Sequence, residues 1–131
     1  MVIMQIFKGN LSKFIQTPKN ALVVGSGQGF LQDLLLQFDT VFVTRQQPSI
    51  RKRNLVYIEN NLKSISSIDL VVLDSYEHIN ELFPILKIHN PLVIIPGCES
   101  DIDLNAYDML KKIQFYVIEY IDGYHVLKHR P

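Results

Sequence analysis

The chain has 131 residues and a mass of 15.1 kDa, the size of a single domain, and 47% of its residues are apolar, enough for a buried core. Thirteen Lys and Arg balance thirteen Asp and Glu, so the net charge does not indicate nucleic-acid binding. The single cysteine, Cys98, excludes an internal disulfide, and no apolar run is long enough to span a bilayer. Residues 1–14 lack the compact apolar stretch of a secretory signal. We therefore expect residues 1–131 to form one soluble, cytoplasmic domain.

Five short apolar runs, most of them containing β-branched residues, are spaced along the chain. They are residues 21–24, 41–43, 55–58, 70–73 and 92–95. Runs this short that are apolar on both faces are typical of strands buried in a parallel sheet. Apolar residues at helical spacing lie between some of them, at residues 30–38, 79–86 and, after the last run, 104–113. This alternation predicts right-handed crossovers and an α/β sheet with helices on both faces.

The remaining segments complete the expected architecture. Residues 46–54 and 60–68 are too short for long helices, which indicates a reduced α/β domain. Residues 115–121 are β-branched and aromatic, and Asp122-Gly123 then gives a strong turn signal, so an antiparallel hairpin is expected at the C-terminus. Residues 3–15 predict a helix that packs on one face of the sheet. The predicted fold is a three-layer α/β sandwich with a mostly parallel sheet.

A glycine-rich loop follows the first predicted strand and opens the first helix, with Gly25, Gly27 and Gly29 at alternate positions. Glycine suits a tight strand-to-helix turn, and it lets a ligand approach main-chain amides at the helix N-terminus. The loop therefore predicts a ligand site in the required strand–loop–helix context. A tight turn that binds nothing is the alternative.

The order of these features resembles a small class I S-adenosylmethionine-dependent methyltransferase domain, over residues 11–130 at the level of pattern. That family has a strand, a G-x-G-x-G loop, alternating helices and strands, and a last strand paired antiparallel after a hairpin. Residues 23–29 lie where its first motif is expected, and Asn61 follows the third strand, where the family supplies a polar residue to the adenine. Asp74 ends a segment similar to the fourth-strand motif. The resemblance implies a Rossmann-like fold and S-adenosylmethionine as cofactor, held by Gly25, Gly27, Gly29, Asn61 and Asp74.

Two positions depart from that family's pattern. Val23 stands where the first motif usually begins with an acid, and Arg45 stands where an acid usually binds both ribose hydroxyls. An arginine only donates hydrogen bonds, so it cannot accept them from these hydroxyls. The departures favour a second interpretation: a non-catalytic, homodimeric binding or scaffold protein that has lost its cofactor.

Arg45 also permits a third interpretation, a protein that binds NADP or another nucleotide. An arginine after the second strand accommodates the NADP 2′-phosphate in some dinucleotide folds, and residues 51–53 are all basic. Phe30 argues against this interpretation, because the dinucleotide motif needs Gly or Ala there for close packing of helix on strand. The simplest interpretation of Arg45 and the basic run is a solvated surface.

Asp74 and Tyr76 are the candidate catalytic residues. They follow a central strand, at the edge where open α/β sheets bind ligands. They echo the acidic and aromatic positions of some amino-group methyltransferases, although the prolines of that motif are missing. In this interpretation Asp74 accepts a proton from an attacking amine and Tyr76 stacks on a planar substrate. Alternatively, Asp74 caps the next helix and Tyr76 packs on the sheet.

Other candidate sites have weaker support. Cys98 follows the fifth strand, but no histidine is placed by the sequence to activate it, so we expect a packing role. The histidines lack the spacing of metal ligands, and we expect no metal site. The terminal hairpin carries four aromatic residues, Phe115, Tyr116, Tyr120 and Tyr124. They predict a homodimer interface; alternatively, they cover the edge of the sheet.

Overall fold

A computed structural model describes most of the chain, including every strand and helix named below. The described residues are 15, 18–25, 28–44, 48, 50–58, 62, 65–73, 79–96, 101–121 and 123–130. The helix expected at residues 3–15 lies outside these residues apart from Ile15, which contacts the core.

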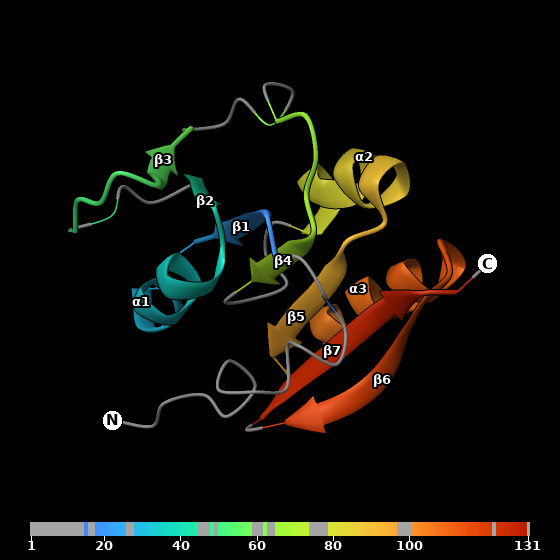
Figure 1. Cartoon of the computed structure of the whole chain (residues 1–131). Helices are drawn as coiled ribbons and strands as arrows, with labels where there is room; N and C mark the ends of the chain where they lie inside the picture. Colours follow the sequence, from blue (N-terminus) through green and yellow to red (C-terminus); the bar gives the residue numbers. More distant parts are fainter. Residues whose placement is uncertain are drawn as a thin grey trace.

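Seven strands and three helices follow one another along the described chain (Figure 1). They are β1 (Asn20–Val24), α1 (Gln28–Gln37), β2 (Thr40–Thr44), β3 (Leu55–Tyr57), β4 (Leu70–Leu73), α2 (Ile79–His89), β5 (Leu92–Pro96), α3 (Asp101–Lys112), β6 (Phe115–Ile121) and β7 (Tyr124–His129). The sheet order is β3-β2-β1-β4-β5-β7-β6. The first five strands are parallel, whereas β7 runs antiparallel to both β5 and β6. The predicted α/β fold with a terminal hairpin is confirmed.

The three central strands are buried on both faces, which explains why their sequences are apolar without alternation. Alternate residues of β1 belong to two separate cores. Ala21 and Val23 pack with Leu31 and Leu34 of α1, whereas Leu22 and its neighbours pack with residues of α2 and α3. One helix therefore covers one face and two helices cover the other, as Figure 1 shows.

Strand β3 differs from the prediction of a strand buried on both faces. It is the edge strand, and Val56 and Tyr57 are each 38% exposed. The connection from β2 contributes no helix among its described residues, 48 and 50–54, so no helix from this segment is seen to cover β3. The run at residues 55–58 is apolar, but its position at the edge leaves part of that surface open.

Two polar side chains join strand ends that are far apart in the sequence. The Asp69 carboxylate, just before β4, accepts hydrogen bonds from the backbone N–H groups of Lys19 and Asn20, both at 3.0 Å, at the start of β1. The Asn54 amide, just before β3, donates to the carbonyls of Leu35 and Phe38 at 3.0 and 3.1 Å. The Leu35 carbonyl lies in the last turn of α1, where helix geometry leaves carbonyls without intrahelical partners, and Phe38 directly follows the helix. The α1 end and the β3 start are thereby held together.

The terminal hairpin packs on α3 through a cluster of rings. Gly123 has φ of +83°, as the predicted tight turn requires, and β6 carries a bulge between Val117 and Glu119. The His125 ring lies 5.0 Å from that of Tyr120 and 6.0 Å from that of Tyr107 on α3, measured between centroids. Burial lowers the pKa of His125 below its usual 6.5. The imidazole is therefore neutral at pH 7.

Asn54→Ala should lower the free energy of unfolding by about 1–2 kcal/mol, because two carbonyls at and just after the end of α1 lose their donor. Urea denaturation measures the change. Asn105→Ala makes the same chemical change at an exposed position of α3 and should not destabilise the protein. Equal stability of the two variants would contradict a bridging role for Asn54.

The wild-type protein should lose stability as the pH falls below 6.5, in part because of His125. Its lowered folded-state pKa means that the unfolded chain binds the proton more readily, so the loss grows from pH 6.5 down through the folded pKa. Urea denaturation at pH 7.5 and 5.5 should show a smaller loss for His125→Phe than for wild type. His89→Gln, on α2, should keep the wild-type difference, and a loss in His125→Phe as large as in wild type would refute this assignment.

Candidate functional site

The candidate site lies at the carboxyl edge of the parallel strands, beside the point where the strand order reverses. From β1 the chain passes through α1 to β2, on one side of β1, whereas β4 pairs with β1 on its other side. The strand order therefore changes direction between β1 and β4, and this is the switch point. Open α/β sheets bind ligands in the crevice outside the carboxyl ends of strands at such a point. Because β1 ends at Val24 and α1 begins at Gln28, only residues 25–27 connect them.

Gly25 makes the strand-to-helix turn in a conformation that favours glycine. Its φ is +92°, in the region where a side chain would be strained. Its N–H donates to the Thr44 carbonyl at 3.1 Å, which extends the pairing of β1 with β2 to the very edge. This confirms the predicted strand–loop–helix arrangement around the first glycine.

The N-terminus of α1 points its unpaired amides toward this edge. Gln28 and Gly29 open the helix, and the first backbone N–H groups of any α-helix lack intrahelical partners. No acidic residue occupies the first turn to neutralise the positive end of the helix dipole. The arrangement suits a polar or negatively charged group of a ligand.

One row of residues crosses the sheet at the same level as this turn. Val24 pairs with Thr44 and with Leu73, and Ile95 pairs with His125. Continuing the β4–β5 register by one residue aligns Leu73 with Ile95. Leu22, Val24, Leu73 and Ile95 all pack on the side of α2 and α3. Residues that pair across neighbouring strands point to the same face of the sheet, so Thr44, the partner of Val24, and His125, the partner of Ile95, share that face. The row therefore places two polar side chains on one face of the carboxyl edge.

Both polar side chains have a buried atom that lacks a hydrogen bond. Thr44 Oγ1 and His125 Nδ1 have no partner in the described part of the chain, and Thr44 is only 2% exposed. Leaving such a group unpaired costs about 1–3 kcal/mol, so an unpaired atom at a ligand edge indicates a missing partner. At about 4.8 Å per strand, four strand spacings put the two residues roughly 19 Å apart. They therefore mark two separate positions at the edge, one beside Gly25 and one at the hairpin.

The structure describes only part of the predicted site. Gly25 lies at the end of β1 and Gly29 in the first turn of α1, as expected. The other predicted site residues lie outside the described residues; these are Gly27, Asn61, Asp74 and Tyr76. Arg45 and Cys98 also lie outside them. The sequence reasoning missed Thr44 and considered His125 only as a metal ligand, because neither forms a motif. Their place in one row emerges from the strand register.

Val23 packs in the core beneath α1 and is 1% exposed. This position therefore offers no carboxylate to a ligand at the edge. Within the described ranges, no group of three His, Cys, Asp or Glu side chains could hold a metal ion. None of the helices in the same ranges has the length and apolar character needed to cross a membrane.

Comparison with known proteins identifies the fold. No protein-family profile and no curated protein matches the sequence. Solved structures do match. The precorrin 8W decarboxylase of Methanobacterium thermoautotrophicum superposes with a TM-score of 0.67 at 16% identity, covering 97% of this chain and 89% of the other. A putative type 11 methyltransferase from Sulfolobus solfataricus gives a TM-score of 0.67 at 12% identity, covering 99% and 95%.

A third match, the MycE methyltransferase of the mycinamycin biosynthetic pathway, was solved in complex with Mg and SAH. It has a TM-score of 0.61 at 12% identity, and the match covers 95% of this chain but only 46% of MycE. At these identities the matches show a shared fold. The chain therefore has the α/β fold of the class I S-adenosylmethionine-dependent methyltransferases.

Proposed function

We propose that the protein binds S-adenosylmethionine, or its demethylated product, at the carboxyl edge between β1 and β4, and that it is a methyltransferase if an acceptor reaches this edge. One observation carries the proposal: the positive-φ Gly25 turn lies beside the buried, unpaired hydroxyl of Thr44. The likeness to a methyltransferase solved with SAH supports the same ligand class.

Thr44 is the side chain at the end of β2 that fits the ribose of such a ligand. Its hydroxyl both donates and accepts hydrogen bonds, whereas an arginine only donates them. Thr44 therefore supplies an acceptor that Arg45 cannot. A neutral hydrogen bond contributes about 0.5–1.5 kcal/mol and one to a charged group about 1.5–3 kcal/mol. We thus expect weaker binding than a carboxylate at this position would give.

The bound cofactor would supply a methyl group on a positively charged sulfur. What the chain itself must contribute is alignment of the acceptor with that methyl group and exclusion of water. Asp74 and Tyr76 follow β4 directly in the sequence, and we assign them the acceptor side of the site. In this assignment Asp74 accepts the proton that an acceptor amine loses, and Tyr76 stacks on a planar acceptor.

A second candidate function, a non-catalytic binding or scaffold protein, is favoured by Val23. The buried valine leaves no acid at that position of the glycine motif. This alternative retains the fold and loses the cofactor. Binding measurements separate it from the first proposal.

We also propose that the protein forms a homodimer through β6. This strand lies at the edge of the sheet, spans seven residues and carries exposed Tyr116 and Tyr120. A long edge strand presents unpaired backbone groups that a second copy can pair with. Antiparallel pairing of β6 with its copy about a two-fold axis would extend the sheet, with Tyr116 on one face and Tyr120 on the other because of the bulge between Val117 and Glu119.

Isothermal titration should detect binding of S-adenosylhomocysteine to wild type, and Thr44→Val should weaken it about tenfold, because one hydrogen bond is lost. The same variant should unfold at equal or higher urea concentration than wild type, since removing an unpaired buried hydroxyl removes its desolvation cost. Thr40→Val makes the same change at the opposite end of β2 and should leave binding unchanged.

If the folded protein binds neither S-adenosylmethionine nor S-adenosylhomocysteine, the non-catalytic alternative holds instead. Binding of NADPH alone would favour the nucleotide-binding interpretation. If Thr44→Val and Thr40→Val bind S-adenosylhomocysteine equally well, Thr44 does not contact the ligand.

Sedimentation equilibrium should show a dimer for wild type and a monomer for Tyr116→Glu, because a charge at the paired edge disfavours association. Ile88→Glu places the same charge on an exposed position of α2 and should remain dimeric. A monomeric wild type, or a dimeric Tyr116→Glu variant, would rule out this interface.

A further inference from the structure

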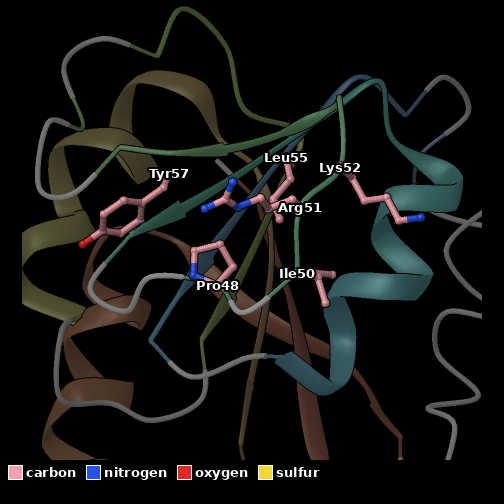
Figure 2. A pocket seen from close by; sticks show the side chains of 6 residues that line it. All are labelled: Pro48, Ile50, Arg51, Lys52, Leu55 and Tyr57. Atoms are coloured by element: carbon pink, nitrogen blue, oxygen red, sulfur yellow. The ribbon is translucent and has the colours of Figure 1, made fainter.

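A concave site lies at the opposite edge of the sheet from the terminal hairpin. It has a volume of about 310 Å³, near the lower end of small-molecule sites. Its wall comes from β3 and the segment before it, and the lining residues are Pro48, Ile50, Arg51, Lys52, Leu55 and Tyr57. Figure 2 shows the guanidinium of Arg51 drawn among Pro48, Leu55 and Tyr57. We call this site the β3 pocket.

The β3 pocket is separate from the carboxyl-edge site between β1 and β4. Leu55 and Ile50 pack against the core beneath α1, and Tyr57 shares the face of Leu55 because it lies two residues further along β3. Thr44 and His125 lie on the other face, and β3 is two strands away from β1. A ligand in this pocket therefore need not touch the glycine turn.

The charges in the β3 pocket are of one sign. Residues 50–58 contain Arg51, Lys52 and Arg53 and no acidic side chain, although the whole chain is neutral. All three cations are exposed, and no ion pair within the described residues engages Arg51 or Lys52. Arg51 and Lys52 both line the pocket, although Figure 2 draws the Lys52 ammonium directed away from the Arg51 guanidinium. A guanidinium fork and an ammonium point charge each suit a phosphate group.

The rest of the β3 pocket is lined by an aromatic ring and apolar side chains. The Tyr57 side chain is 38% exposed, so part of its ring is open to a ligand. Pro48, Ile50 and Leu55 supply the apolar remainder of the wall. An aromatic ring beside basic side chains is the arrangement that binds nucleobases by stacking while the cations hold the phosphate.

We propose that the β3 pocket binds a nucleoside phosphate, with the base against Tyr57 and the phosphate on Arg51 and Lys52. The volume suits a single nucleotide unit. That unit is either a free nucleotide or one nucleotide of a single-stranded nucleic acid, since both present the same base and phosphate. This site is independent of cofactor binding at the carboxyl edge.

Isothermal titration of the full chain with AMP, adenosine and inorganic phosphate tests the proposal. AMP should bind more tightly than either of its parts. The double variant Arg51→Gln/Lys52→Gln should weaken AMP binding by tenfold or more, as expected for loss of charged hydrogen bonds. The control double variant Lys87→Gln/Lys112→Gln removes two exposed charges from α2 and α3 and should bind AMP as wild type does.

Substitutions of Tyr57 test the stacking. Tyr57→Leu should weaken AMP binding roughly tenfold, whereas Tyr57→Phe keeps the ring and should restore wild-type affinity. Far-ultraviolet circular dichroism confirms that each variant is folded. Equal AMP binding by wild type and the Arg51→Gln/Lys52→Gln variant would overturn the proposal. So would phosphate binding as tightly as AMP, or no AMP binding at all by a folded wild type.

Two further binding measurements identify the source of the nucleotide and distinguish the β3 pocket from the carboxyl-edge site. If a single-stranded RNA octamer binds more than tenfold tighter than AMP with a steep salt dependence, the ligand is a nucleic-acid strand; equal affinity indicates a free nucleotide. Both outcomes support the pocket. Saturating S-adenosylhomocysteine should leave AMP binding unchanged, and displacement of AMP would place it at the carboxyl edge and overturn the proposal. Failure of S-adenosylhomocysteine to bind leaves the AMP result intact.

Discussion

The structure depends on burial of β1 on both of its faces. Residues 21–24 are at most 1% exposed, and alternate side chains enter two cores, one beneath α1 and one beneath α2 and α3. A shift of the strand by one residue would exchange the two sets, so packing specifies the register strongly. That register aligns the ends of β2, β1, β4, β5 and β7 in one row at the carboxyl edge. The candidate site is therefore a consequence of how the core packs.

Three described residues give this edge its character. Gly25 takes a positive φ, and within the described part of the chain the buried Thr44 hydroxyl and the buried Nδ1 of His125 have no hydrogen-bond partner. Val23, at the position where the family that the sequence resembles usually has an acid, packs in the core. At the end of β2 this edge therefore presents a hydroxyl, on a fold like that of the methyltransferases.

The shortened connection between β2 and β3 has consequences of its own. Its described residues form no helix, and the edge strand keeps Tyr57 partly open beside Arg51 and Lys52, two exposed cations that no ion pair among the described residues engages. Because Asn54 ties the start of β3 to the end of α1, the pocket wall is held in place although the strand has only three residues. A connection whose described residues form no helix thus leaves a concave surface at β3, on the face away from Thr44.

Local pattern was sufficient to identify the strands, the three described helices, the turn at Gly25 and the terminal hairpin, because each depends on periodicity or turn chemistry within a few residues. The apolar run at 55–58 was misjudged as fully buried, because composition does not reveal which strand lies at an edge. The pairing of Thr44 with Val24, and of His125 with Ile95, depends on strand order and register. These are set by packing between residues far apart in the chain, so the row of polar groups at the carboxyl edge emerged only when the sheet was assembled.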